Sequence, residues 1–219
     1  MKRTDFDPSA LSSRDFYRLL TAVVVPRPIA WVSSTAEDGT DNLAPHSFYT
    51  VASVSPPIIQ FTSVGEKDSL RNIQAQGEFV VNLTPASLFE EVNATGTDFP
   101  AHTSEFDAAG LTREPSTKVR PSRVKESPVA LECRLHLTVP VGDCTLVFGE
   151  VVHAVVSSEV LEGSHPRIDR LDPLSRLGRN EWGTLGPIRE IKRIRVDDWP
   201  GHFDPRACGE SPVSHIGES

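Results

Sequence analysis

The sequence predicts a β-rich α+β fold in which short helices flank a closed or half-closed β-barrel. An Asp38-Gly39 turn lies between two strand-like stretches, which is typical of a β-hairpin because glycine adopts the positive φ of a tight turn. Residues 129–139 alternate between apolar and polar side chains, as expected of a strand with one buried face. The strands are separated by short helices and turns without a regular βαβ repeat, which favours a barrel over a doubly wound sheet.

Helices and strands are expected to alternate along the first half of the chain. Ser12 and Asp15 have the spacing of a capping box, so they predict a helix that ends before Pro26. Pro45 cannot donate to a ladder, which places the second hairpin strand at an edge or a bulge. The other elements expected here are a strand over residues 57–62, a helix over 67–76 that Gly77 ends, a strand over 78–83 and a short helix over 85–93.

The second half is expected to hold one long irregular segment and three strands. Residues 94–126 contain several prolines and no periodic pattern, and a loop of this length is often functional or covers a partner subunit. Strands are expected over residues 129–139, 145–156 and 189–196. We expect a single domain over residues 1–199 and an irregular C-terminal tail over residues 200–219, which is rich in glycine, proline and serine.

Composition and charge exclude several classes of protein. The chain has 219 residues, of which 38% are hydrophobic and 24% charged, and its net charge of -8 argues against nonspecific binding to nucleic acid or to an anionic membrane. The N-terminus lacks the apolar core of a signal peptide, and no run is long and apolar enough to cross a membrane. Cys133, Cys144 and Cys208 have no metal or redox spacing, and the histidines have no metal spacing. We therefore expect a cytoplasmic protein with reduced thiols and no metal site.

The hairpin concentrates polar groups on one surface. Three hydroxyl residues, Ser33 to Thr35, end the first strand, and we expect them opposite Asn42, Ala44 and Ser47 of the returning chain. Such a surface combines backbone amides, hydroxyls and one carboxamide. A flat heteroaromatic ring with carbonyl and nitrogen edges is the kind of ligand that fits it.

A second polar group lies where a strand is followed by a helix. Thr62 and Ser63 end the strand, and the segment from Lys67 to Ser69 opens the helix. Free amides at a helix N-terminus, an ammonium group and nearby hydroxyls form an anion site, typically for a phosphate. The alternative is that Asp68 or Ser69 only caps the helix and that Lys67 is a solvated surface charge.

The order of these motifs resembles that of the flavin reductase-like proteins, which bind FMN in a split β-barrel and include the flavoredoxins. The resemblance covers roughly residues 14–195. It rests on the following segments: Pro26 to Val32, Ser33 to Thr35, Asp38-Gly39, Asn42 to Pro45, Phe48-Tyr49, Pro56-Pro57, Lys67 to Ser69, Gly77 to Asn82, Glu126 to Pro128, Leu131 to Cys133 and Gly149 to Val151. The ordered set is specific for the family and much less specific for the reaction.

The resemblance implies an FMN site built from both polar groups. The phosphate end would be formed by Thr62, Ser63, Lys67, Asp68 and Ser69. The ring end would be formed by Trp31, Ser33, Ser34, Thr35, Asn42, Ala44, Pro45, His46 and Ser47. Two of these residues have an ordinary alternative, since Trp31 also fits a plain core position and His46 a surface position.

A late segment of the chain is expected to approach the flavin. In the family this segment tends towards an arginine, two glycines and a tyrosine, often across a dimer interface, whereas this chain has Arg176, Gly178, Arg179 and Trp182. The resemblance implies that Arg179 and Trp182 contact the cofactor and that the protein is a homodimer. A surface turn with an anchored tryptophan is the alternative. Arg27, between two prolines, is expected to make a structural ion pair at the barrel mouth.

The resemblance implies an NAD(P)H-dependent flavin reductase. FMN would accept a hydride at N5 and pass electrons to free flavin, a partner oxygenase or another acceptor. Hydride transfer between two cofactors needs little acid or base from the protein, so the catalytic residues stay unassigned. The absence of a Gly-x-Gly-x-x-Gly motif excludes a Rossmann site but not transient stacking of NADH or NADPH on the flavin.

Three other functions stay open. A nonenzymatic FMN-binding electron-transfer protein would hold its flavin tightly without a nicotinamide pocket. An enzyme like pyridoxamine phosphate oxidase shares the split barrel, although the Pro-Arg-Pro-Ile-Ala-Trp-Val and Asn-Leu-Ala-Pro segments argue against it. An interaction domain would have kept the barrel and lost the cofactor. The sequence distinguishes neither NADH from NADPH nor a prosthetic flavin from a flavin substrate.

Overall fold

The computed structural model describes residues 1–100 and 102–199, and the chain divides into two compact units. The first unit is Met1–Leu185, and the second is Gly186–Ser219. The predicted tail over residues 200–219 lies outside the described residues, so the domain boundary at residue 199 stays a prediction. Cys208 lies there too, whereas Cys133 and Cys144 are free thiols.

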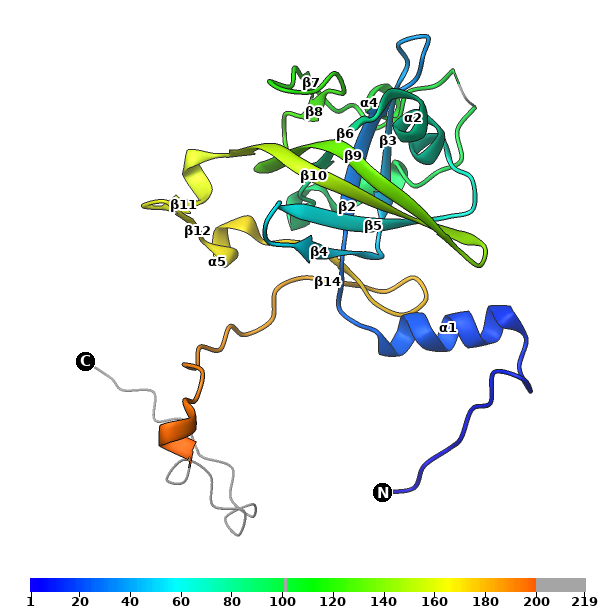
Figure 1. Ribbon diagram of the computed structural model, residues 1–219, viewed down its shortest axis with the longest axis vertical. Coiled ribbons are helices and arrows are strands. Elements are labelled where there is room, and N and C mark those ends of the chain that lie inside the picture. The colour runs from blue at the N-terminus through cyan, green and yellow to red at the C-terminus, as the bar shows by residue number, and fades with distance from the viewer. Residues whose placement is uncertain (101, 200–219) are drawn as a thin grey trace. The chain divides into compact units, whose positions relative to one another are not determined.

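A seven-stranded antiparallel sheet forms the body of the first unit (Figure 1). Its strand order is β3-β2-β6-β9-β10-β5-β4. The strands are β2 Ala30–Thr35, β3 Asp41–His46, β4 Tyr49–Ser53, β5 Ile58–Val64, β6 Glu78–Asn82, β9 Val129–Val141 and β10 Cys144–Val156. The predicted β-rich α+β fold is confirmed, because each strand predicted before residue 160 has its counterpart in this sheet.

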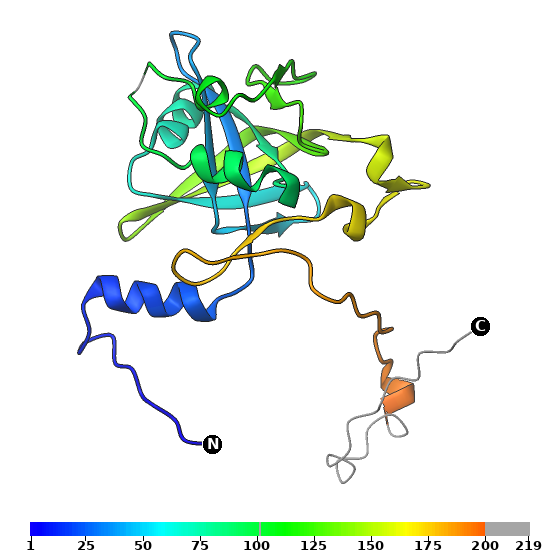
Figure 2. The same cartoon turned by 180° about the vertical axis from the view of Figure 1, so that it is seen from behind.

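Shorter elements surround the sheet. The helices are α1 Ser13–Val23, α2 Asp68–Gln76, α3 Phe89–Ala94, α4 Glu105–Ala108 and α5 Ile168–Leu171, and the 3-10 helices of the described residues are η1 Ala86–Leu88, η2 Ser158–Val160 and η3 Val196–Asp198. The short strands are β1 Arg27–Pro28, β7 Arg113–Glu114, β8 Arg123–Val124, β11 Leu161–Glu162, β12 His165–Pro166, β13 Ser175–Arg176 and β14 Trp182–Gly183. Seen from behind, the helical segment of residues 86–94 (green) crosses the face of the sheet (Figure 2).

Three predicted helix boundaries are confirmed, namely both ends of α1 and the end of α2. Ser12 caps α1, because its side chain accepts a hydrogen bond from the backbone N–H of Asp15. The helix ends before Pro26, as expected. Gly77 ends α2 in the left-handed conformation with a φ of 72°, which glycine adopts without a steric penalty.

The predicted hairpin is formed by β2 and β3. Gly39 in the connecting turn has a φ of 93°, which glycine adopts without strain. β3 lies at the end of the strand order, so Pro45 occupies an edge strand as its missing N–H predicted. The edge position leaves one side of the β3 backbone free for other partners.

The register of the hairpin differs in part from the prediction. Ser34 pairs with Asn42 as expected, but Val32 pairs with Ala44, and Ser47 lies beyond the end of β3. The expectation that the hydroxyl run faces Ala44 and Ser47 is therefore wrong. The turn centred on Asp38-Gly39 brings only the first residues of β3 opposite the three hydroxyl residues.

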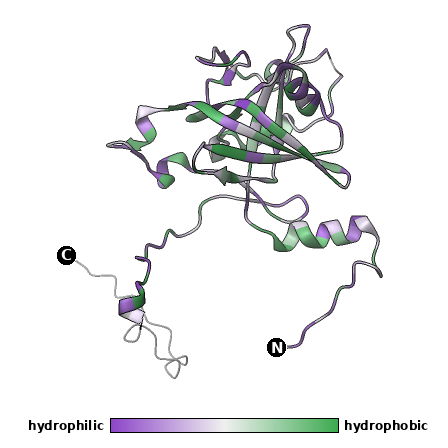
Figure 3. Cartoon of the chain, in the orientation of Figure 1, coloured by the Kyte–Doolittle hydropathy of each residue, from purple (hydrophilic) through white to green (hydrophobic). Residues whose placement is uncertain are grey.

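Two apolar clusters join the sheet to the elements that cover it. The first cluster contains Ala30, Val32, Ile59, Phe61, Leu70, Ile73, Phe79, Val81, Cys133 and Val147, and it packs α2 against the strands. The second contains Ile29, Trp31, Leu43, Val92, Phe106, Leu111, Val124 and Leu174, and it joins β2 and β3 to α3 and α4. Burial of each large apolar side chain contributes about 1.5–3 kcal/mol. Figure 3 shows apolar stretches along β5, β9 and β10, and the mixed character of α1.

The polar face predicted for β9 is buried in its first half. Glu132 is fully buried, because the segment that contains β8 packs over this part of the strand. Its carboxylate accepts hydrogen bonds from the backbone N–H groups of Thr117 (2.9 Å) and Lys118 (2.6 Å) and from Nη1 of Arg123 (3.2 Å). The alternating pattern therefore identified the strand but not the environment of this residue.

Two other segments need a correction. The region 94–126 is not one irregular loop, since it contains α4 and the two-stranded β7–β8 ladder. The strand predicted over residues 189–196 is wrong: the segment has no ladder within the described part of the chain, and Ile191 is 82% exposed. An alternating pattern forms a strand only where another strand can pair with it.

Candidate functional site

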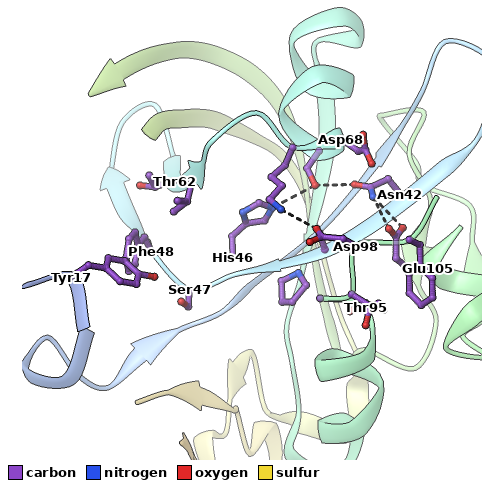
Figure 4. Close-up of a pocket in the computed structure, with 18 residues that line it drawn as sticks. Tyr17, Asn42, His46, Ser47, Phe48, Thr62, Asp68, Thr95, Asp98 and Glu105 are labelled. Carbon is purple, nitrogen blue, oxygen red and sulfur yellow. Dashed lines mark hydrogen bonds and ion pairs between the residues drawn. The ribbon is translucent and has the colours of Figure 1, made fainter. Parts of the chain in front are cut away.

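A cavity of about 270 Å³ lies where β3, β5 and the start of α2 meet residues 95–99 (Figure 4). It is lined by Tyr17, Asn42, Ala44, Pro45, His46, Ser47, Phe48, Thr62, Val64, Lys67, Asp68, Ser69, Thr95, Gly96, Thr97, Asp98, Phe99 and Glu105. Aromatic rings stand beside hydroxyl, carboxamide, imidazole, ammonium and carboxylate groups. This mixture suits a ligand that is both aromatic and polar.

The cavity brings together part of the residues predicted to bind a cofactor. Those that line it are Asn42, Ala44, Pro45, His46, Ser47, Thr62, Lys67, Asp68 and Ser69. The predicted residues that do not line it are Trp31, Ser33, Ser34, Thr35, Ser63, Arg179 and Trp182. The ring surface and the anion site, inferred separately from the sequence, thus meet in one cavity.

The structure places the hydroxyl run of β2 in the interior. Ser33 Oγ donates to the carbonyl oxygen of Ser122 (2.5 Å), and Thr35 Oγ1 donates to the carboxylate of Asp41 (2.9 Å). Ser34 is buried as well, like every other residue of the strand. β2 lies between β3 and β6, so its hydroxyls are used inside the protein rather than at the cavity.

Trp31 and Ser63 lie behind the cavity wall. Trp31 is fully buried, and its Nε1 donates to Oγ1 of Thr95 at 2.9 Å, so it supports a wall residue from the core. Ser63 is buried and donates to the carbonyl oxygen of Gly65 at 2.9 Å. Successive strand residues point to opposite faces, which leaves Thr62 as the residue of this pair that faces the cavity.

Helix α2 begins at the cavity without a capping side chain. Its N-cap is Lys67, which makes no side-chain cap hydrogen bond, so the alternative in which Asp68 or Ser69 caps the helix is wrong. The first N–H groups of a helix have no partner within the helix, and this end carries the positive end of the helix dipole. Lys67 Nζ is paired with Asp98 at 2.9 Å, and both side chains are at least half exposed.

A hydrogen-bond network joins α2 to α4 along the cavity wall (dashed lines in Figure 4). Ser69 Oγ donates to Oδ1 of Asn42 at 2.8 Å, and Asn42 Nδ2 donates to both carboxylate oxygens of Glu105 at 3.0 and 3.1 Å. Glu105 also accepts the backbone N–H of Leu43 at 2.8 Å. Because its hydroxyl hydrogen is given to Asn42, Ser69 offers an anion its backbone N–H rather than its hydroxyl.

Glu105 is a site residue that was not predicted from the sequence. It is 6% exposed, and this burial raises the pKa of its carboxyl group, while hydrogen bonds from Leu43 and Asn42 act in the opposite direction. A local signal existed, since Ser104 precedes the helix and Gly110 follows it, as in a capped helix. That signal finds α4, but not the contact with Asn42, which lies 63 residues earlier in the chain.

His46 lines the cavity and is not the surface residue of the alternative interpretation. Its ring is buried, with its centroid 4.7 Å from that of Phe61 and its Nε2 3.4 Å from Ser69 Oγ. Burial, the largest cause, and the nearby Lys67 cation together lower the pKa of His46 to about 4, against a hydrogen bond with the backbone of Thr62. The imidazole is therefore neutral at pH 7 and offers hydrogen bonding without charge.

Two further cavities adjoin the first at Ser47. One has a volume of about 290 Å³ and is lined in part by Trp182, whose ring packs edge-on against Phe89 at 5.2 Å. The other has a volume of about 670 Å³ and is lined in part by Arg176 and Arg179. The late segment of the chain thus reaches the edge of the site through these cavities.

The described residues contain neither a candidate metal site nor a candidate membrane-spanning helix. Within residues 1–100 and 102–199, no group of three or more His, Cys, Asp or Glu side chains is placed to hold a metal ion. In the same ranges, no helix is long and apolar enough to cross a membrane.

Comparison with known proteins gives a family match and similar structures. The family model described as "Flavin reductase like domain" matches residues 22–173. The structure is similar to nitrilotriacetate monooxygenase component B from Bacillus cereus, with a TM-score of 0.84 and 32% sequence identity, over 87% of this chain and 100% of that one. It is also similar to 2-nitrobenzoate 2-nitroreductase from Pseudomonas fluorescens, with a TM-score of 0.83 and 30% identity, over 88% of this chain and 98% of that one.

A third similar structure bears on the fold alone. It is a split-barrel protein from Shewanella frigidimarina, with a TM-score of 0.79 and 20% identity, and the match covers 88% of this chain and 100% of that one. The sheet described above is therefore a split β-barrel.

The burial of His46 predicts a pH-dependent stability. Its pKa is about 4 in the folded protein and about 6.5 in the unfolded chain, so the unfolded state binds more protons between these values. Stability from this residue is complete above about pH 6.5 and is lost as the pH falls towards 4, by about 3 kcal/mol in total. We expect His46→Gln to reduce the fall in the free energy of unfolding between pH 7.5 and pH 4.5, measured by urea denaturation.

A matched control is His136→Gln, which removes an exposed histidine of β9. This variant should keep the pH dependence of the unmodified protein. An equal fall in the free energy of unfolding for His46→Gln and the unmodified protein would contradict the neutral, buried state of His46.

Proposed function

The chain belongs to the flavin reductase-like family, as its motifs indicated, and from this premise we propose that it is an FMN-binding oxidoreductase that uses NADH or NADPH. The observation that carries the proposal is that three anion-binding features line one cavity, which aromatic rings also line. These are the uncapped N-terminus of α2, the ammonium group of Lys67 and the hydroxyl of Thr62. Membership of the family makes a flavin the cofactor to test against them.

These donors fit the phosphate of FMN. The free N–H groups of α2, Lys67 and Thr62 would donate to its oxygens, and charge-assisted bonds of this kind are among the strongest. Asp98 would compete with the phosphate for Lys67, so binding would exchange one ion pair for another. When bound, FMN would supply two-electron chemistry, taking a hydride from a reduced nicotinamide and passing the electrons on to free flavin or a partner protein.

Other parts of the cavity lining fit the ring system. The end of β3 and Ser47 offer backbone groups on the free side of an edge strand. Tyr17, Phe48 and Phe99 provide aromatic surface that would exclude water from the ring. His46 also lines the cavity and is neutral, so Lys67 would supply the positive charge for the phosphate.

The similarity to nitrilotriacetate monooxygenase component B supports a partner oxygenase as the acceptor of the electrons. The similarity to 2-nitrobenzoate 2-nitroreductase supports direct reduction of a small aromatic acceptor instead. Both acceptors need the same reduced flavin, so the first test concerns the donor.

The test is an anaerobic visible absorption spectrum of the FMN-loaded protein, recorded before and after addition of NADH and then of NADPH. We expect the absorption band of the bound flavin to bleach rapidly, which would also identify the donor. A yellow protein that neither nucleotide bleaches would contradict the reductase and leave the nonenzymatic electron carrier. A protein that does not bind FMN would contradict the cofactor assignment as well.

Two substitutions test the phosphate end through FMN affinity, measured by quenching of flavin fluorescence. Lys67→Ala removes a charge-assisted hydrogen bond, for which we expect about tenfold weaker binding. Asp98→Asn removes the competing carboxylate and should strengthen binding about two- to fivefold. Lys118→Ala is the control, since it removes one lysine that is exposed and lies outside the cavity. Unchanged affinity in Lys67→Ala would remove this residue from the phosphate site.

We also propose that the protein is a homodimer that uses the apolar side of α1. Leu20 is 47% exposed and Val23 63% in a helix whose polar side carries Arg14 and Asp15, and Val24, which ends the helix as its C-cap, is 60% exposed. Apolar side chains gathered on one helix in this way mark an interaction surface. A second copy of the chain is the partner in this proposal, and the sequence resemblance supports the same assembly.

The assembly is tested by light scattering during size-exclusion chromatography. Leu20→Asp combined with Val23→Asp should convert the dimer to a monomer, because an interface that buries two carboxylates loses several kcal/mol. Val54→Asp is the control, because Val54 is 90% exposed and lies outside α1. A monomeric unmodified protein, or a double variant that stays dimeric, would contradict the proposal.

A further inference from the structure

An arginine-rich cavity of about 670 Å³ lies beside the proposed flavin cavity, between α1 and residues 176–180. Arg18, Arg27, Arg176 and Arg179 line it, and no aspartate or glutamate does. The cationic lining contrasts with the net charge of the chain, which is -8. We call this the arginine cavity.

Arg27 is the buried member of this group. It is 8% exposed, and its guanidinium donates to the carbonyl oxygens of Leu177 (2.7 Å), Val24 (3.1 Å) and Thr21. None of the ion pairs among the described residues includes Arg27, and its Nε has no hydrogen-bond partner. The ion pair predicted for Arg27 from the sequence is therefore not formed. Carbonyl groups solvate this cation without neutralising it.

Arg176 and Arg179 add uncompensated charge. The Arg176 guanidinium carbon lies 4.4 Å from the centroid of the Trp182 ring, and its Nη2 donates to the carbonyl oxygen of Arg179 at 2.9 Å. Neither arginine has an ion pair within the described ranges, whereas Arg18 is paired with Asp15. Burial lowers the pKa of Arg27, and the Arg176 cation acts in the same direction, against the opposite effect of Tyr17. These cations are close enough to repel, and an anion between them would relieve the repulsion.

The position of the arginine cavity links it to the proposed reaction. Tyr17 and Ser47 line both this cavity and the proposed flavin cavity. A molecule anchored by an oxyanion among the arginines would therefore extend past Ser47 towards the flavin. Guanidinium groups bind phosphate and carboxylate alike, with paired hydrogen bonds to two oxygens.

We propose that the arginine cavity binds the anionic group, phosphate or carboxylate, of the small molecule that exchanges electrons with the flavin. The site would hold an oxyanion with Arg27, Arg176 and Arg179 and leave the reacting ring of the molecule free to enter the flavin cavity. This inference rests on the proposed function for the identity of the reaction, but the anion site itself follows from the charges of the cavity. It identifies the arginines as determinants of affinity for charged partners.

The first experiment measures anion binding directly, by calorimetric titration of the full-length protein with inorganic pyrophosphate and, separately, with benzoate. The variant is Arg176→Gln combined with Arg179→Gln, and the control is Arg134→Gln, which removes an exposed arginine of β9 outside the cavity. Loss of two charge-assisted contacts should weaken binding of at least one probe by about tenfold or more. The control should bind as the unmodified protein does. Equal affinity in all three proteins would overturn the proposal.

The second experiment separates the donor from the acceptor as the source of the anion. In the FMN-loaded double variant, an anionic donor site predicts slower reduction by NADH than in the unmodified protein, with unchanged reduction by the uncharged 1-benzyl-1,4-dihydronicotinamide. An anionic acceptor site predicts slower oxidation by 2-nitrobenzoate, with unchanged oxidation by nitrobenzene. A variant that loses rate equally with charged and uncharged partners would overturn the proposal. Failure of the unmodified protein to bind FMN would instead refute the proposed function, and the pyrophosphate titration would still decide the anion site.

Discussion

The hydrogen bonds between Glu105 and the edge strand β3 hold the cavity in shape. One carboxylate accepts from the backbone of Leu43 and from the side chain of Asn42, and it is nearly free of solvent. A buried carboxylate that lost these donors would destabilise the fold by several kcal/mol. Asn42 is thereby fixed with its carbonyl oxygen towards Ser69, so the contact with Glu105 also sets the start of α2. The wall of the cavity follows from this one contact.

A second buried carboxylate makes similar hydrogen bonds to the later part of the segment between residues 94 and 126. Glu132 of β9 accepts from the backbone of Thr117 and Lys118 and pairs with Arg123. The segment between residues 94 and 126 has little regular structure. Two buried carboxylates nevertheless join it to the sheet, since Glu105 of the segment bonds to β3 and Glu132 of β9 bonds to the segment. Exposing either carboxylate would break these hydrogen bonds. Besides the apolar contacts of Phe106, Leu111 and Val124, hydrogen bonds to these two buried carboxylates attach the segment to the large sheet.

The parts of the fold that depend on near neighbours could be predicted from the sequence. The Asp38-Gly39 hairpin, the cap at Ser12 and the end of α2 at Gly77 each follow from the conformation of one or two residues. The start of α2 next to Lys67 was equally predictable, because it depends on the residues next to it in the chain, whereas its role as an anion site stays a prediction.

The features that depend on distant contacts could not be predicted from the sequence. Ser33 and Thr35 were expected at the cavity because they are polar, but β2 is covered on both faces and they bond inside the protein. Glu105 could not be connected with Asn42, and the alternation of residues 189–196 gave no sign that a pairing strand was missing. In each case the pattern was present in the sequence, but contacts with distant residues determined the structure that the segment forms.

The uncapped start of α2 has a thermodynamic consequence. A side-chain cap at such a position stabilises a helix by about 1 kcal/mol, and Lys67 supplies none. The protein thus keeps unsatisfied the donors that an anionic ligand would satisfy, and a bound anion would complete the helix as its missing cap. Binding and folding are then linked, since a ligand present at about 100 times its Kd adds about 2.7 kcal/mol to stability. The loaded protein would resist heat and proteolysis better than the empty one, and the ligand supply of the cell would control how much protein persists.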